Sequence, residues 1–89
     1  MQIYYHKRFI KQMKKLQVHE RIAVTDAIDL FRKDPFSTTL KNHALKGSML
    51  GARAISAGFD LRILFEEHDN YTLVVMVAVG THDTVYPHN

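Results

Sequence analysis

The C-terminal half of the chain most strongly constrains the fold, because successive segments there have β-type patterning and short turns between them. Residues 59–66 alternate, with apolar side chains on one face and mostly polar ones on the other, as in a strand with one buried face. Residues 71–79 are apolar on both faces, which is typical of a central strand. Residues 67–70 predict the hairpin turn between these strands. Residues 52–57 predict a preceding strand, with Gly58 in the turn, so three consecutive strands form an antiparallel sheet.

The N-terminal part predicts a short strand at residues 2–5, followed by two amphipathic helices. Residues 7–17 place apolar side chains on one stripe and lysines on the opposite stripe. This helix begins after His6, where serine or aspartate would be the better N-cap. Residues 19–33 form the second helix, and Pro35 limits it because proline disfavours helical backbone in the preceding residue. The first apolar stripe consists of Phe9, Ile10, Met13 and Leu16.

The order of elements is therefore β-α-α-β-β-β, which places the chain in the α+β class. We expect a small, mostly antiparallel sheet with the two N-terminal helices packed on one face. Residues 36–51 show no period and predict an irregular loop with one short turn, and such long loops are often functional. Residues 81–89 predict a short tail. The length of 89 residues predicts one domain, residues 1–89.

Composition excludes several classes of function. The chain has no cysteine, so disulfides and thiolate metal sites are ruled out. Its six histidines show no close metal-ligand spacing, no phosphate-cradling glycine motif occurs, and the serines lack a nucleophile-elbow context. We therefore predict no metal and no cofactor. The longest apolar run, residues 73–79, is far shorter than the roughly 20 residues of a membrane span. No signal peptide is apparent, so a cytoplasmic location is expected.

Positive charge is concentrated near the N-terminus. The net charge is +3, yet no acidic residue occurs in residues 1–15. The basic residues of this segment are Lys7, Arg8, Lys11, Lys14 and Lys15. The ordinary interpretation is a solvated helix face that keeps a small domain soluble. The functional interpretation is a surface that binds nucleic-acid phosphates independently of base sequence and is weakened by salt.

A two-residue turn at residues 57–58 would set the register of the strands on either side. Arg53 would then pair with Arg62, so both arginines would lie side by side on the polar face of the sheet. Two like charges that face each other are unfavourable unless an anion lies between them. The carboxylate of Asp60 or Glu66 would serve in a purely structural arrangement, and a bound phosphate would serve in a functional one.

Two histidines lie in sequence contexts that suit acid–base chemistry. His82 directly follows the last predicted strand, where functional residues often lie, and histidine titrates near neutral pH. His43 lies between Lys41 and Lys46, whose positive charges favour the neutral imidazole that can accept a proton. The alternative interpretations are a capping histidine in an exposed turn for His82 and an ordinary surface histidine for His43.

Four strings, together with the lysine-rich first helix, point to one family of small proteins. The strings are residues 40–48 (LKNHALKGS), 52–56 (ARAIS), 59–65 (FDLRILF) and 79–86 (VGTHDTVY). In this order, on these elements, they make the chain similar to the RelE/ParE superfamily of type II toxin–antitoxin toxins, and within it to the YafQ-like mRNA interferases. The resemblance covers nearly the whole chain and implies the RelE-like fold.

The resemblance implies a toxin that cuts mRNA in the ribosomal A site and is neutralised by a cognate antitoxin protein, with a heterotetramer among the expected complexes. No metal is required in this chemistry. The 2′-OH of the ribonucleotide attacks the adjacent phosphorus and leaves a cyclic phosphate and a 5′-OH. Such a reaction needs a base for the 2′-OH, an acid for the leaving oxygen and cations for the phosphorane.

The resemblance also implies roles for single residues. Carried over by position, His43, Asp60 and His82 match residues of the YafQ-like catalytic site. Tyr86 matches a terminal aromatic residue that can stack on a base. By chemistry, His82 is the acid, and His43 or Asp60 is the base or its orienter. The cations expected to hold the RNA are Arg53 and Arg62 as a phosphate clamp, with Lys41 and Lys46 as further backbone contacts.

Three positions depart from the family pattern. Ser56 stands where YafQ-like enzymes carry another histidine, Leu61 where they carry tryptophan, and Ala78 where they carry an arginine near the strand end. Without that arginine, Arg62 would have to stabilise the phosphorane. Two alternatives therefore stay open: a ParE-like inhibitor of DNA gyrase on the same fold, and a catalytically degenerate module that only binds an antitoxin.

Overall fold

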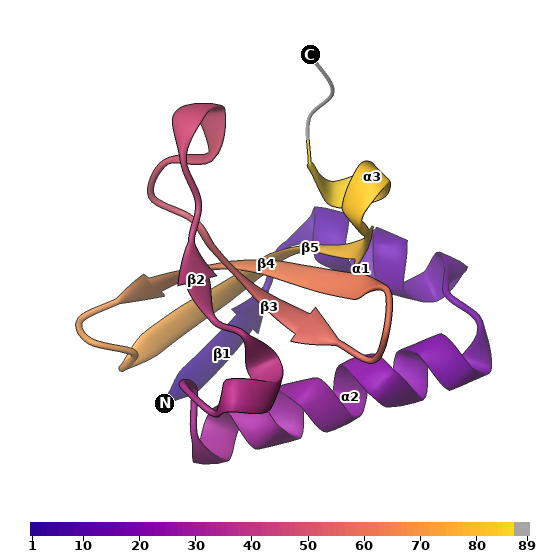
Figure 1. Ribbon diagram of the computed structural model, residues 1–89, viewed down its shortest axis with the longest axis horizontal. Helices are drawn as coiled ribbons and strands as arrows, with labels where there is room; N and C mark the ends of the chain where they lie inside the picture. Colours follow the sequence, from indigo (N-terminus) through magenta and orange to yellow (C-terminus); the bar gives the residue numbers. More distant parts are fainter. Residues whose placement is uncertain (87–89) are drawn as a thin grey trace.

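A five-stranded sheet with two helices on one face forms most of the molecule (Figure 1). This computed structural model describes residues 1–86. The strands lie in the order β1-β5-β4-β3-β2, and only the β1–β5 pair is parallel among the described residues. The prediction of an α+β fold with a mostly antiparallel sheet is therefore confirmed. The elements are β1 (Gln2–Tyr5), α1 (Lys7–Lys15), α2 (Val18–Lys33), η1 (Thr38–Leu40), β2 (His43–Ala44), η2 (Gly47–Met49), β3 (Arg53–Ala57), β4 (Leu61–His68), β5 (Leu73–Thr81) and α3 (His82–Val85).

Short elements lie where the sequence predicts irregular chain. Residues 36–51 contain two 3-10 turns, η1 and η2, and the two-residue strand β2 between them, which pairs with β3. A strand this short has too few residues to show a period. The predicted tail is also different, because β5 continues to Thr81 and residues 82–85 form α3. Residues 87–89 of that tail lie outside the described residues.

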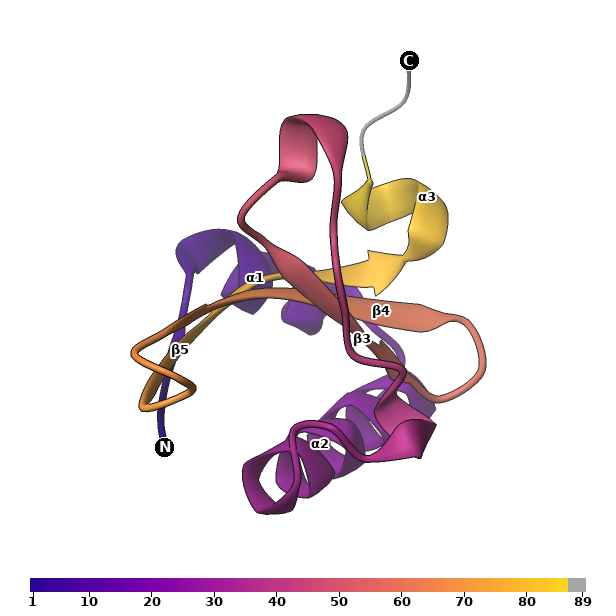
Figure 2. The same cartoon turned by 60° about the vertical axis from the view of Figure 1, so that its left-hand side comes forward.

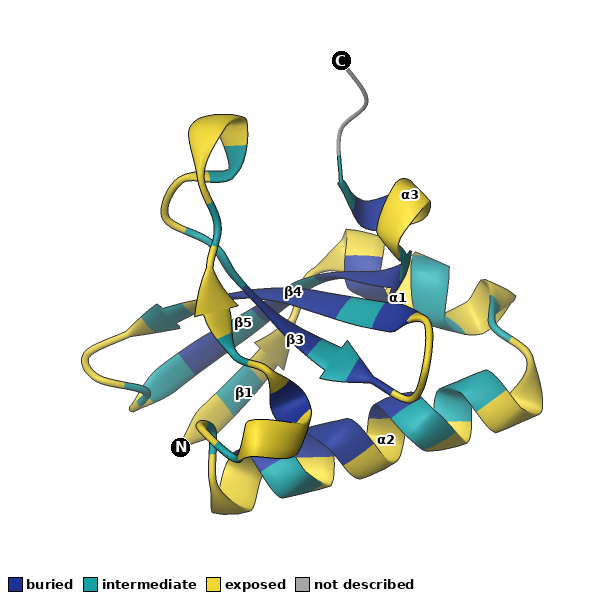
Figure 3. Cartoon of the chain, viewed as in Figure 1, coloured by how far each residue is buried: buried dark blue, intermediate teal, exposed yellow. Residues whose placement is uncertain are grey.

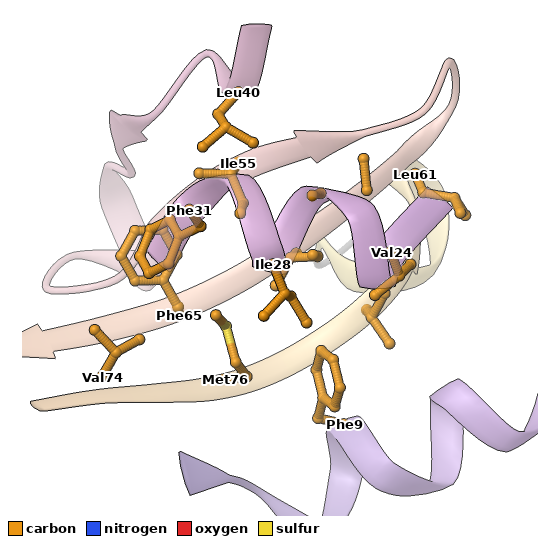
Figure 4. Packing of buried hydrophobic residues seen from close by; sticks show 14 residues of the cluster. Phe9, Val24, Ile28, Phe31, Leu40, Ile55, Leu61, Phe65, Val74 and Met76 are labelled. Carbon is orange, nitrogen blue, oxygen red and sulfur yellow. The ribbon is translucent and has the colours of Figure 1, made fainter. Parts of the chain in front are cut away.

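The main core lies between the helices and the sheet (Figure 4). Phe31 of α2 and Phe65 of β4 meet edge to face, with ring centroids 4.9 Å apart. Phe9 brings α1 onto β5. The sequence also places Ile10 on the apolar stripe of α1, yet its side chain is 44% exposed. The reason is that a hollow remains beside α1, between Ile10 and Arg21 of α2.

Local polar contacts define where the two helices begin. His6 is an effective cap for α1, because its Nδ1 accepts a hydrogen bond from the backbone N–H of Arg8 at 3.1 Å. The expectation of a poor cap at His6 is therefore wrong: the imidazole nitrogen does what a serine or aspartate oxygen would do. At the start of α2, the N–H of Gln17 donates to the Glu20 carboxylate at 2.9 Å.

The turn between β3 and β4 has three residues, 58–60, instead of the predicted two. Gly58 adopts a left-handed φ of 60° in this turn, which glycine does without steric cost. The longer turn shifts the register, so Arg53 pairs with Phe65, and Arg62 pairs with Ser56. The predicted pairing of Arg53 with Arg62 is therefore wrong. Because the shift is odd, the two arginines lie on opposite faces of the sheet.

The face opposite the helices, here called the open face, is flanked by two projections (Figures 1 and 2). On one side, residues 43–52 rise from the sheet as an arm that is largely exposed (Figure 3). On the other side stands α3. A small buried cluster on this face consists of Ala54, Leu64, Ala78 and Val85. Among residues 1–86, no helix is both long and apolar enough to cross a membrane.

Candidate active site

Arg62, His82 and Tyr86 gather where β4 and β5 meet α3, and they are here called the strand-end cluster. The rings of His82 and Tyr86 have centroids 4.5 Å apart and planes inclined by 52°. Arg62 pairs with Gly80 across β4 and β5 and lies near enough to Tyr86 to affect its ionisation. The guanidinium also donates to the Leu61 carbonyl at 2.9 Å. A cation, an imidazole and an aromatic ring therefore share one end of the open face.

Two electrostatic features characterise this cluster. Burial raises the pKa of the Tyr86 hydroxyl, and the positive charge of Arg62 offsets part of that rise. Tyr86 is therefore a neutral aromatic group at physiological pH, because an ordinary tyrosine already titrates near about 10. Nδ1 of His82 lies 3.7 Å from Oδ1 of Asp83, an ion pair when His82 is protonated. Both side chains are largely exposed, so solvent screens this pair.

A close approach of α3 to β5 positions His82 and Tyr86. A Cβ added at Gly80 would lie 3.0 Å from Cγ2 of Thr84, so a larger residue at this position would crowd the helix. The hydroxyls of Thr81 and Thr84 are hydrogen-bonded at 2.9 Å. The predicted motif at residues 80–83 is thus a compact strand-to-helix turn, and its histidine is the first residue of the helix.

The sequence analysis places Asp60 in a strand, but in the structure Asp60 lies in the turn between β3 and β4. Leu61 pairs with Thr81. Asp60 precedes Leu61 and His82 follows Thr81, so both residues lie at the same end of the β4–β5 pair, and Asp60 lines a hollow there with His19 and Glu20 of α2. Phe59, in the same turn, has a side chain that is fully exposed, although the alternation predicts it on the apolar face.

His43 shares the open face but lies on its far side. It pairs with Ala54 of β3, and paired residues share a face of the sheet. Two strands separate β2 from β5, so three strand spacings put His43 about 14 Å across the face from β5. Its Nδ1 lies 2.8 Å from the Lys41 carbonyl oxygen. A carbonyl can only accept, so Nδ1 is the donor in this contact. Lys41 and Lys46, on either side of His43, are exposed.

Arg53 is separated from the strand-end cluster by the sheet itself. Its Nε donates to Oδ1 of Asn42 at 2.9 Å, and its guanidinium lies 5.9 Å from the centre of the Phe36 ring. Asn42 in turn donates to the Pro35 carbonyl at 3.0 Å and is hydrogen-bonded to the Tyr71 hydroxyl at 3.1 Å. Arg53 thus anchors the segment before β2 on the helix face. The predicted clamp of Arg53 with Arg62 does not form.

Sequence reasoning missed residues that reach the open face from distant segments. Arg8 of α1 and Ser48 and Met49 of the arm line a hollow next to Tyr86. Arg8 looks like one more cation on a solvated helix face, and η2 has no periodic pattern. Only a signal of contact between distant positions could have identified them. Among residues 1–86, no group of three or more His, Asp or Glu side chains is arranged to hold a metal ion.

The fold has counterparts among solved structures. YafQ from Escherichia coli superposes with a TM-score of 0.80 at 21% identity, over 96% of this chain and 97% of that one. A copper-bound mutant toxin from Helicobacter pylori gives a TM-score of 0.77 at 21% identity, over 97% and 99% of the two chains. The E. coli DinJ-YafQ toxin-antitoxin complex gives a TM-score of 0.69 at 20% identity, over 96% of each chain. At these identities the superpositions establish the fold.

Two N-terminal helices on a five-stranded, mostly antiparallel sheet make up the RelE/YafQ-like fold. A family model described as "Bacterial toxin of type II toxin-antitoxin system, YafQ" matches residues 1–87. The chain belongs to the YafQ family of type II toxins, as the resemblance of its four strings predicts. A search among curated proteins gives no match.

Proposed function

We propose that this toxin is an endoribonuclease that cuts mRNA in the ribosomal A site and is held inactive by a cognate antitoxin. The observation that carries the proposal is the strand-end cluster, where Arg62, His82 and Tyr86 share the open face beside α3. An imidazole can move a proton, a guanidinium can stabilise a phosphorane, and an aromatic ring can stack on a base. Membership of the YafQ family supports the same activity.

The proposed reaction is an intramolecular phosphoryl transfer within the RNA. A base takes the proton of the 2′-OH, the 2′-oxygen bonds to the adjacent phosphorus, and the bond from phosphorus to the 5′-oxygen breaks. His82 donates a proton to that leaving oxygen, so the products are a 2′,3′-cyclic phosphate and a 5′-OH. Arg62 stabilises the negative charge on the phosphorane. Both acid–base transfer and charge stabilisation are needed to reach useful rates.

Asp60 is better located than His43 to assist His82. Asp60 and His82 flank the same pair of residues at one end of β4 and β5, whereas His43 lies about 14 Å from β5. We therefore assign the base, or the group that orients it, to Asp60. His43, Lys41 and Lys46 contact the RNA farther along the open face, where the arm presents them to solvent.

Arg62 compensates for the arginine that Ala78 replaces. Ala78 pairs with Leu64, and Arg62 pairs with Gly80, on the same face of the neighbouring strand. Arg62 and Ala78 are therefore diagonal neighbours, within reach of a long side chain. The guanidinium of Arg62 can thus occupy the region that an arginine at position 78 would reach.

The antitoxin surface that we propose is the apolar hollow beside α1. It has a volume of about 330 Å³, and Tyr5, Phe9, Ile10 and Met13 line it, with Lys14 and Arg21 among its cations. Apolar walls with basic residues fit an amphipathic, acidic segment of a partner.

Substituting Ile10→Glu should weaken antitoxin binding at least 100-fold and leave toxicity intact. Ile22→Glu, exposed on α2 outside this hollow, is the matched control. Equal affinities of the two variants would refute this surface.

The first test is primer extension on mRNA from cells that briefly express the chain, beside the His82→Ala variant. Discrete breaks in translated frames that disappear in the variant would support the proposal. His82 is exposed, so the variant should keep its thermal stability, which circular dichroism checks. Growth arrest with intact mRNA would contradict the nuclease and favour gyrase inhibition. Antitoxin binding without any arrest would contradict it and favour a degenerate binding module.

A further inference from the structure

A second hollow opens beside Tyr86, and the proposed function has not used it. Its volume is about 400 Å³, within the range of about 300–1,000 Å³ that small-molecule sites occupy. Three segments that are distant in sequence line it: the arm tip, α3 and the start of α1. The side chains that matter here are Arg8, Ser48, Met49, Asp83 and Tyr86.

One wall of this hollow is positively charged. Arg8 lies in the first turn of α1, which contains no acidic residue, and a helix N-terminus is itself positive. A cation there adds to the helix dipole instead of opposing it, so the local potential favours an anion. The backbone at this point is well anchored, because His6 caps the helix and its N–H donates to the Met76 carbonyl of β5 at 2.9 Å.

The other wall offers an apolar and aromatic surface. Tyr86 and Met49 are partly buried and pack on the small cluster of the open face. The Tyr86 ring also contacts His82, so this wall adjoins the proposed catalytic group directly. Asp83 lines the hollow as well and repels phosphate, which leaves the Arg8 side for the anion. A ligand with a flat ring at one end and a phosphate at the other fits a hollow that is aromatic on one side and positively charged on the other.

We infer that this hollow binds the nucleotide on the 3′ side of the cut, with its base against Tyr86 and Met49 and its 3′-phosphate on Arg8. The inference rests on the proposed function, in which His82 protonates the 5′-oxygen of that same nucleotide. The nucleotide attached to the leaving oxygen must lie next to His82, and Tyr86 links His82 to the hollow. Arg8 is then a positioning residue for the RNA, contributed by a helix outside the strand-end cluster.

Two small probes isolate the contact of Arg8. Adenosine 3′,5′-bisphosphate carries phosphates on both sides of the nucleotide, whereas adenosine 5′-monophosphate lacks the one assigned to Arg8. We expect the bisphosphate to bind the wild-type toxin about tenfold more tightly, as one charge-assisted contact would give. Arg8→Ala should abolish this difference without changing the affinity for the monophosphate. Arg62→Ala should weaken both probes. Calorimetry at fixed salt measures all the affinities.

Matched variants separate a specific contact from general positive charge. Lys11→Ala removes an exposed cation of α1 that does not line the hollow and should leave the tenfold difference in place. Arg8→Lys should retain part of it. Equal binding of both probes to the wild-type toxin, or the same loss in Lys11→Ala as in Arg8→Ala, would overturn the inference.

If mRNA is cut in cells while the probes show no Arg8 dependence, this inference alone fails. If mRNA stays intact while the probes behave as expected, the proposed nuclease fails.

Discussion

At the residue scale, the candidate site depends on how three side chains divide the chemistry. Burial raises the already high pKa of Tyr86, so this neutral ring is suited to stacking and not to proton abstraction. His82 is exposed at the first position of α3, and Arg62 lies beside Tyr86 on the neighbouring strand. Each group thus has one task, and each task can be tested by removing a single side chain.

The ionisation of Tyr86 should report directly on Arg62. Burial disfavours the phenolate and Arg62 favours it, so Arg62→Ala should raise the pKa of Tyr86 further, while Arg62→Lys should retain much of the wild-type value. The difference in phenolate absorbance between each protein and its Tyr86→Phe counterpart measures this. Because folding raises the pKa, Tyr86 stabilises the fold fully below about pH 10, and this contribution is lost as pH rises through the folded value. Identical titrations in wild type and Arg62→Ala would contradict their proximity.

The two histidines should differ in their effect on cleavage. Loss of a general acid costs about 100- to 10,000-fold in rate, and we expect His82→Ala to fall in this range. His43 lies about 14 Å from β5, so His43→Ala should slow cleavage by less than about tenfold. The rate at which mRNA breaks accumulate after induction measures both. A larger loss in His43→Ala than in His82→Ala would reverse the assignment of roles.

At the element scale, α3 is the element on which the site depends. Four residues form it, far fewer than an isolated helix needs to be stable. It therefore depends on its packing over Gly80 and on Val85, which is buried in the small cluster of the open face. The arm on the opposite side is more loosely supported, because β2 has only two paired residues.

Substituting Gly80→Ala should displace α3. The added Cβ would lie 3.0 Å from Cγ2 of Thr84, and overpacking of this kind costs about 1–3 kcal/mol. We expect lower stability in urea unfolding and a loss of cleavage. Thr84→Ser removes Cγ2 but keeps the hydroxyl that bonds Thr81, so the double variant should recover part of both losses. No recovery in the double variant would show that another contact is responsible.

At the scale of the whole molecule, the sheet divides the chain into a structural side and a chemical side. The helices α1 and α2 and the main core occupy one face, and α3, the strand-end cluster and the arm occupy the other. Arg53 and Arg62 are only nine positions apart, yet the register of β3 and β4 sends them to different sides. Their substitutions should therefore have opposite consequences.

Arg53→Ala should lower the free energy of unfolding by about 1–3 kcal/mol, because Asn42 loses a charged hydrogen-bond partner. Its effect on cleavage at a permissive temperature should be small. Arg62→Ala should do the reverse, with nearly unchanged stability and little cleavage. Urea unfolding and primer extension on the same two variants provide the comparison. Equal stability losses, or an equal loss of cleavage, would contradict the assignment of the two faces.

Patterning within the sequence determined the strands, the two long helices and the α+β class. The 2.0-residue period at residues 59–66 and the 3.6-residue period at residues 7–17 each arise from contacts of one element with one surface. His82 and Tyr86 could be located beforehand for a related reason, because the motif at residues 79–86 is local to a single strand end. The irregular segment at residues 36–51 carries no such period, so its short elements were not visible.

Tertiary structure alone decided which face each arginine occupies and which segments meet around Tyr86. A turn one residue longer than predicted reversed the relation of Arg53 to Arg62, because side chains alternate along a strand and an odd shift changes the face. Arg8, Met49 and Tyr86 meet only because the sheet brings the start of α1, the arm and α3 to one hollow. Local propensity acts over a few residues of chain, whereas the lining of this hollow comes from segments far apart in the sequence and assembles only when the core packs.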